Sequence, residues 1–238
     1  MLNTIVHGEP DSGPALLIAH GLFGSARNWG AIAKRLARER PVVAVDMRNH
    51  GASPWRESHG YPDLAADLAE VIDAFGGQMD VLGHSMGGKA AMALALSSTE
   101  RVRRLIVADI APVAYDHTQT PLIEAMESVD LGAVRSRKDA DRALEDHISE
   151  TSVRAFLAQS LDVKGEHPRW VLNLPVLKME MAGIIGFPEV SGSFDGPSLF
   201  LTGDASDYVL DSHRGEIRSM FPLAEFEAIP GAGHWLHA

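Results

Sequence analysis

A chain of 238 residues, 45% hydrophobic and 22% charged, is long and apolar enough for one sizeable globular domain with room for an inserted subdomain. Its net charge of −11 argues against binding to nucleic acid or anionic membranes, and no run of about 18 apolar residues predicts a membrane span. The absence of cysteine excludes disulfides and thiolate metal sites, and with no secretory signal pattern at the N-terminus we expect a cytoplasmic protein.

Short apolar runs alternate with helical patterns along most of the chain. The predicted strands are residues 15–19, 41–45, 79–82, 105–108, 198–202 and 226–229. The predicted helices between them are residues 28–40, 63–75, 89–96 and 211–220. This alternation indicates right-handed βαβ units, and therefore an α/β fold with a mostly parallel sheet flanked by helices.

The stretch from residue 111 to residue 196 interrupts the alternation. It is rich in charges and helix formers, and helical segments are predicted at residues 122–127, 139–150 and 153–161. Ligands of parallel sheets bind beyond the carboxyl ends of the strands, so we expect this stretch to form a small helical cap there. The predicted division is a core of residues 1–111 and 197–238, with a cap insertion of residues 112–196.

The most informative motif is Gly83-His84-Ser85-Met86-Gly87, between a predicted strand and a predicted helix. In the Gly-X-Ser-X-Gly pattern a sharp turn exposes the serine hydroxyl at the end of the sheet, and glycines avoid side-chain collisions within the turn. The motif predicts Ser85 as a nucleophile and the Met86 amide, at a helix N-terminus, as a hydrogen-bond donor. Taken alone, it also fits an ordinary strand–turn–helix junction.

A serine hydroxyl needs a neighbouring base to act as a nucleophile. Among eleven histidines, His234 is the predicted base, because it follows the last predicted strand between flexible glycines and because histidine comes last in this kind of triad. The other histidines, including the nearly terminal His237, are expected to be structural. No pair shows metal-ligand spacing, so the prediction includes neither a metal nor a cofactor.

The segment His20-Gly21-Leu22-Phe23-Gly24 follows the first buried strand. Acyl transfer passes through an oxyanion that needs two preorganised donors, one from the residue after the nucleophile and one from such a loop. We predict the amides of Met86 and Phe23 as these donors, with Leu22 as the alternative to Phe23. A plain glycine-bearing turn is the other interpretation of this loop.

The acid of the triad has several candidates, because Asp109, Asp204 and Asp207 all follow predicted strands. The position three residues past Gly203, where serine hydrolases with this chain order often carry the acid, holds Ser206. A hydroxyl can orient an imidazole but cannot offset its positive charge. We therefore predict Asp109 as the acid, with Ser206 as an auxiliary partner of His234 and Asp207 as the alternative acid.

The acyl pocket is predicted from apolar side chains of the loops and the cap. The candidates are Phe23, Met86, Leu122, Met126, Trp170, Met179 and Met181. Each of them taken singly also fits the ordinary hydrophobic core.

Together these motifs resemble those of the α/β-hydrolase superfamily, and more closely those of the YbfF-type esterases. The resemblance is carried by residues 20–25, 46–53, 83–89, 109–113 and 231–237. It implies a serine carboxylesterase with a small helical cap that hydrolyses short-chain acyl esters, and it implies Asp109 and Ser206 beside Ser85 and His234. It also implies that the second of these stretches braces the oxyanion loop. Relatives continue into a final helix, whereas this chain stops four residues after His234, so we expect different packing there.

Several activities share this machinery. Perhydrolase, thioesterase and carbon–carbon bond hydrolase activities stay open as alternatives, and so does a ligand-binding receptor that keeps the triad without rapid turnover. Dehalogenase and epoxide hydrolase activities are disfavoured, because those relatives place an aspartate where Ser85 stands. The expected partner is a small-molecule ester, and the sequence makes no prediction of oligomeric state.

Overall fold

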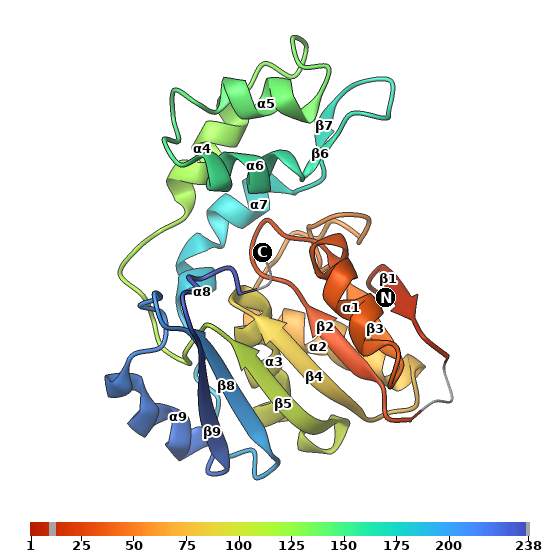
Figure 1. Ribbon diagram of the computed structural model, residues 1–238, viewed down its shortest axis with the longest axis vertical. Coiled ribbons are helices and arrows are strands. Elements are labelled where there is room, and N and C mark those ends of the chain that lie inside the picture. Colours follow the sequence, from red (N-terminus) through yellow and green to blue (C-terminus); the bar gives the residue numbers. More distant parts are fainter. Residues whose placement is uncertain (10–12, 237–238) are drawn as a thin grey trace.

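The computed structural model describes residues 1–9 and 13–236, and it contains a seven-stranded sheet beneath a group of helices (Figure 1). The strands lie in the order β1-β3-β2-β4-β5-β8-β9; β1 is antiparallel to β3 and the other neighbours are parallel. They are β1 (Thr4–His7), β2 (Leu16–Ala19), β3 (Val42–Val45), β4 (Met79–His84), β5 (Val102–Ala108), β8 (Ser198–Gly203) and β9 (Ala224–Ile229). The predicted α/β fold with a mostly parallel sheet is confirmed. His237 lies outside the described residues.

Helices cover both faces of this sheet, with α1 on one face and α2 and α3 on the other (Figure 1). The helices of the core are α1 (Gly30–Leu36), α2 (Tyr61–Ala74), α3 (Met86–Ser97) and α9 (Arg214–Met220). Alternate residues of β2 supply the two hydrophobic clusters, since Leu16 and Ile18 pack with Trp29 while Leu17 packs with Leu68. The strands of the centre are therefore buried on both sides, as their continuous apolar runs predicted.

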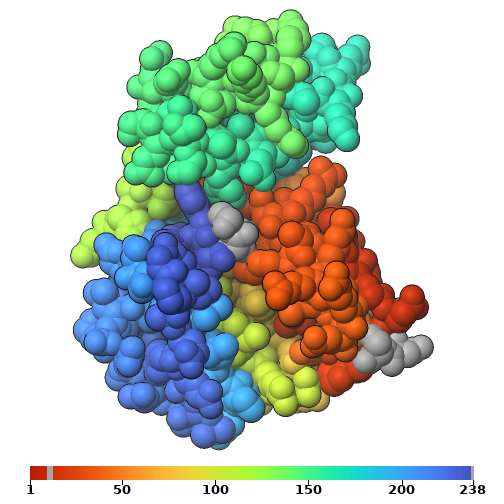
Figure 2. Space-filling view, in the orientation of Figure 1, coloured from red at the N-terminus to blue at the C-terminus, as the bar shows by residue number. Residues whose placement is uncertain are grey.

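The cap consists of short elements that lie above the carboxyl ends of the strands (Figure 1). Its helices are α4 (Thr120–Ser128), α5 (Arg137–Ala143), α6 (Thr151–Ala158), α7 (Leu174–Met179) and α8 (Met181–Ile185), and β6 (Leu161–Asp162) pairs antiparallel with β7 (Arg169–Trp170). The space-filling view shows it resting on both the N-terminal and the C-terminal parts of the core (Figure 2). The predicted boundaries at residues 112 and 196 fall in the two connections between these elements and the sheet.

Some predicted elements differ from those observed. The helix predicted at residues 139–150 ends earlier, because α5 stops at Ala143 and a turn follows it. The edge strand β1 was not predicted, since its side chains are only partly buried and lack the apolar run of a central strand. Within residues 1–9 and 13–236, no helix has the length and apolar character required to cross a membrane.

Candidate active site

Ser85 occupies the sharp turn between β4 and α3, in a backbone conformation that side chains rarely adopt, with φ of 52° and ψ of −121°. The space around the turn explains its glycines. A Cβ atom on Gly83 would overlap the carbonyl group of Gly87, and one on Gly87 would overlap the carbonyl oxygen of Ala19 at the end of β2. The turn therefore presents the Ser85 hydroxyl at the carboxyl edge of the sheet only because both positions lack side chains.

Three side chains from distant parts of the chain meet at this edge. The Ser85 hydroxyl lies 3.0 Å from His234 Nε2, and His234 Nδ1 lies 2.8 Å from Asp109 Oδ2. Asp109, directly after β5, is fully buried, and the His234 side chain is 23% exposed. The structure thus places the predicted nucleophile, base and first-choice acid in one continuous hydrogen-bonded chain.

Asp109 is held by further donors from the loop after β8. Ser206 Oγ donates to Asp109 Oδ2 at 2.5 Å, and the Gly203 amide donates to Oδ1 at 3.1 Å. Ser206 therefore contacts the acid rather than the imidazole, which differs from the predicted auxiliary bond to His234. Asp207 comes next along the loop and makes no hydrogen bond to His234, so the alternative acid is not in place.

Two residues that the sequence did not single out for this purpose hold the imidazole of His234. The ring of Tyr208 stacks on it with centroids 3.8 Å apart and planes 19° from parallel. His84 Nε2 lies 2.8 Å from the backbone carbonyl oxygen of His234 and donates to it. Tyr208 had no sequence signal, whereas His84 stands inside the motif of Ser85 and was expected only to be structural.

The oxyanion loop, defined as residues 20–24, differs from the prediction in one respect. The Phe23 amide donates to His50 Nε2 at 3.2 Å, so it is already engaged within the core. Our first choice of second donor is therefore wrong. The alternative, the amide of Leu22, has no such partner, and Leu22 lines the cavity in front of Ser85 together with Met86. These two residues supply the candidate amide donors.

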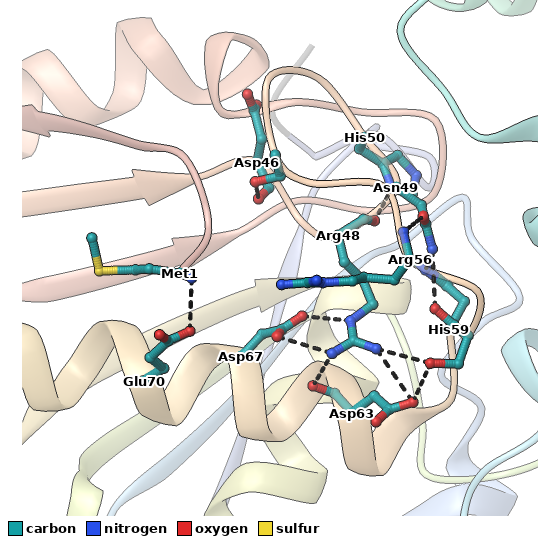
Figure 3. A network of polar contacts seen from close by, with 12 residues as sticks. Met1, Asp46, Arg48, Asn49, His50, Arg56, His59, Asp63, Asp67 and Glu70 are labelled. Atoms are coloured by element: carbon teal, nitrogen blue, oxygen red, sulfur yellow. Dashed lines mark hydrogen bonds and ion pairs between the residues drawn. The ribbon is translucent and has the colours of Figure 1, made fainter.

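The loop after β3 connects the oxyanion loop to α2. Asp46 Oδ1 accepts a hydrogen bond of 2.8 Å from the Ala26 amide, just past the oxyanion loop. Arg48 points the other way and forms a bidentate pair with Asp67 and a further contact with Asp63, both on α2 (Figure 3). The loop thus fixes the oxyanion loop to a helix of the core, in the bracing role that the resemblance implied.

Three histidines are buried behind the oxyanion loop. His20 Nε2 accepts from the Met47 amide at 2.9 Å, and His50 Nδ1 donates to the Arg48 carbonyl oxygen at 2.8 Å. Burial lowers the pKa values of His20 and His50, and burial together with the Arg48 charge lowers the pKa of His59 to about 3. These rings are therefore neutral at pH 7, which leaves His50 Nε2 free to accept the amide hydrogen of Phe23.

A cavity of about 400 Å³ opens in front of Ser85 and His234. Core and cap both contribute to its mainly apolar wall, which includes Leu22, Phe23, Tyr61, Met86, Ile110, Tyr115, Leu122, Val153, Phe156, Leu157, Ile184, Ile185 and Trp235. Its polar lining beyond the reactive groups includes Asn28, His117, Gln119 and Glu150. Such a wall suits a ligand that is mostly hydrocarbon, with one polar centre at Ser85.

Three of the predicted pocket residues, Phe23, Met86 and Leu122, line this cavity. Four others do not: Met126, Trp170, Met179 and Met181. Trp170 Nε1 donates to the Met126 carbonyl oxygen at 2.9 Å, and both side chains are buried among cap residues. Met179 is 66% exposed. Apolar residues at helical spacing do not reveal which of them face a cavity and which fill a core, and this accounts for the difference.

Lys89 is a buried cation that the sequence did not explain. Its Nζ donates to the carbonyl oxygens of Val113 and Ile185, both at 2.8 Å, and of Gly186 at 2.5 Å. All three ammonium hydrogens are therefore used, so Lys89 has none to offer a substrate although it lines the cavity. Within residues 1–9 and 13–236, no group of three or more histidine, aspartate or glutamate side chains could hold a metal ion.

Comparisons with known proteins agree with this architecture. Residues 14–238 match the protein family described as alpha/beta hydrolase fold. The chain is 40% identical to the sn-1-specific diacylglycerol lipase ABHD11 of Mus musculus, over 94% of this chain and 76% of that protein. It is 38% identical to Esterase YbfF of Escherichia coli (strain K12), over 94% of this chain and 87% of that protein. A solved marine microorganism esterase has a TM-score of 0.93 at 37% identity, covering 99% of this chain and 93% of its own.

Proposed function

The chain belongs to the α/β-hydrolase family and is an enzyme of its esterase and lipase type, and from this premise we propose that it is a serine carboxylesterase for short-chain acyl esters. The observation that carries the proposal is the contact of His234 Nε2 with the Ser85 hydroxyl at 3.0 Å, with Asp109 on the other ring nitrogen. A hydroxyl so placed can lose its proton as it attacks.

The proposed reaction has two steps. Ser85 Oγ attacks the ester carbonyl while His234 accepts its proton, and the amides of Met86 and Leu22 donate to the oxyanion. The imidazolium, stabilised by Asp109, then protonates the departing alcohol and leaves an acyl group on Ser85. Water attacks the acyl-enzyme with His234 again as the base, and the carboxylic acid departs.

Replacement of the nucleophile tests this proposal. Ser85→Ala should lower turnover of p-nitrophenyl acetate and butyrate by about 10⁴-fold or more, because the acyl-enzyme cannot form. It should also abolish labelling by a fluorophosphonate probe. The matched control is Ser219→Ala on α9, whose hydroxyl donates to the Glu216 carbonyl oxygen and should be dispensable. Undiminished turnover in Ser85→Ala would contradict the proposal.

Acyl length is the finer part of the proposal. A cavity of about 400 Å³ closed by cap residues supports short chains, as does the similarity to Esterase YbfF. The 40% identity to a diacylglycerol lipase favours acylglycerols as a second candidate class. Rates on p-nitrophenyl esters from C2 to C16, together with a diacylglycerol, would separate the two. A maximum at long chains would refute the short-chain assignment.

Thioesters, peracids and diketones should be poorer substrates than esters, and the same assays would test this. Labelling by the fluorophosphonate with negligible turnover on every ester would instead favour a receptor. The partner we propose is a small-molecule ester, and a cytoplasmic location stays a prediction.

A further inference from the structure

Phe23 has a left-handed backbone conformation with φ of 64°, although it is not glycine. Such a residue keeps this conformation only when its surroundings fix it. Both of its backbone polar groups are bound by side chains from elsewhere in the chain. Its amide donates to His50 Nε2 at 3.2 Å, and its carbonyl oxygen accepts from Ser160 Oγ at 2.7 Å.

These two partners belong to different parts of the molecule. His50 lies in the core loop after β3, whereas Ser160 lies in the cap, between α6 and β6. Ser160 is 6% exposed, so water cannot readily replace its bond to Phe23. The backbone of Ser160 is fixed as well, because its carbonyl oxygen accepts from the Val171 amide at 2.9 Å.

The contact of Ser160 is part of a wider seam between the cap and the loops of the core. The neighbouring Gln159 accepts a hydrogen bond of 2.8 Å from the side chain of Asn28, just beyond the oxyanion loop. On the other strand of the small hairpin, the Val171 carbonyl oxygen accepts from the Gly51 amide at 2.8 Å. Only the bond from Ser160 reaches the peptide that adjoins the Leu22 donor.

We propose that Ser160 is a positioning residue through which the cap sets the geometry of the oxyanion loop. Its hydroxyl fixes the carbonyl of Phe23, His50 fixes the amide on the other side, and the adjoining Leu22 amide is thereby directed at the oxyanion. The inference rests on the proposed ester hydrolysis. It adds that the cap contributes to transition-state stabilisation as well as enclosing the substrate.

Ser160→Ala tests the inference. Removal of a whole oxyanion donor lowers kcat about 10²–10³-fold, and a displaced donor should lose part of that, so we expect a fall of about 10- to 100-fold with KM little changed. Affinity for a trifluoromethyl ketone, which forms the oxyanion, should fall by the same factor as kcat/KM. Affinity for butyrate, a product without an oxyanion, should stay within about twofold.

Two further variants keep the test decisive. Ser160→Cys retains the side-chain shape with a weaker donor, so it should show a smaller loss than Ser160→Ala even if the alanine variant folds poorly. Ser128→Ala is the matched control, because Ser128 is a cap residue whose hydroxyl donates to Ala125 within the same helix. It should leave kcat and both affinities unchanged.

The inference is overturned if Ser160→Ala and Ser160→Cys keep kcat and ketone affinity within about twofold of the parent enzyme. Equal loss of ketone and butyrate affinity would also overturn it, since that pattern indicates a loosened cap. Failure of the proposed function is a separate result. In that case the parent enzyme hydrolyses no ester, or Ser85→Ala hydrolyses esters as well as the parent does.

Discussion

Three residues at the site, Phe23, Ser85 and Asp109, have φ values of 64°, 52° and 53°, although none is glycine. Each such conformation costs of order 1–3 kcal/mol and requires compensation from its surroundings. Glycines compensate at Ser85, hydrogen bonds to two side chains at Phe23, and backbone and hydroxyl donors at Asp109. Strain of this kind, gathered at one edge of the sheet, marks the site independently of any sequence motif.

The assignment of the acid gives a prediction for single residues. Asp109→Asn should lower kcat by about 10³- to 10⁴-fold, because an amide cannot offset the charge of the imidazolium. Asp207→Asn is the matched control and should keep most of kcat, since Asp207 does not bond to His234. Steady-state kinetics on p-nitrophenyl butyrate would measure both. The reverse order of losses would show that Asp207 is the acid.

Local motifs predicted Ser85 and His234, because the elbow and the glycine-flanked loop each lie within a few residues. The second oxyanion donor depended on something more distant. Phe23 and Leu22 are equivalent in the motif, and only His50, 27 residues away, decides which amide is engaged. The acid had the same difficulty, since several strands end in aspartate and the sequence does not measure their distance from the imidazole.

At the scale of elements, α3 is the helix that every part of the site touches. Every residue from Met86 to Leu96 is buried, and Lys89 is the one charged side chain among them. A lone charge in an otherwise apolar buried helix is a sequence signal, and it was overlooked. The structure shows its use, because the Lys89 ammonium joins both connections of the cap to the core, at Val113 and at Ile185 and Gly186.

Lys89→Met should destabilise the protein by about 2–4 kcal/mol, since methionine preserves the volume but leaves buried carbonyl oxygens without their donor. Urea unfolding would measure the loss. Lys178→Met is the matched control: Lys178 pairs with Glu124 and Glu127 at a partly exposed site, so its loss should cost about 0–1 kcal/mol. Equal losses in the two variants would refute a special role for Lys89.

The sheet of the core was predictable from sequence because its strands are buried on both faces and appear as continuous apolar runs. The exceptions have physical reasons. The edge strand β1 owes its structure to pairing with β3, which no local pattern reports. In the cap, α7 and α8 have six and five residues, too few for an amphipathic period to stand out.

At the scale of the whole molecule, the buried histidines link stability to pH. Burial lowers the pKa values of His20, His50 and His59 in the folded chain, while in the unfolded chain they take their ordinary value near 6.5. Between about pH 6.5 and the lower folded values, the unfolded chain binds protons that the folded chain does not. Their contribution to stability is therefore complete above pH 6.5 and falls as the pH decreases toward about 3.

The free energy of unfolding should accordingly fall below pH 6.5, by about 1.4 kcal/mol per pH unit for each of these histidines. Urea titrations between pH 8 and pH 4 would measure this slope. His59→Leu should reduce it by about one proton, whatever its effect on stability at pH 8. The matched control is His147→Leu, because His147 is exposed to water in the folded chain. An unchanged slope in His59→Leu would contradict the prediction.

The chain departs from the core and rejoins it at points that a single ammonium group can reach, since Lys89 contacts both Val113 and Gly186. Two ends so close together can be bridged by segments of very different length without disturbing the strands below. Lineages could therefore exchange the intervening segment for another and acquire a new substrate range over an unaltered reaction centre. A graft made between these two positions, with Ser160 or an equivalent hydroxyl retained, is the engineering form of the same idea.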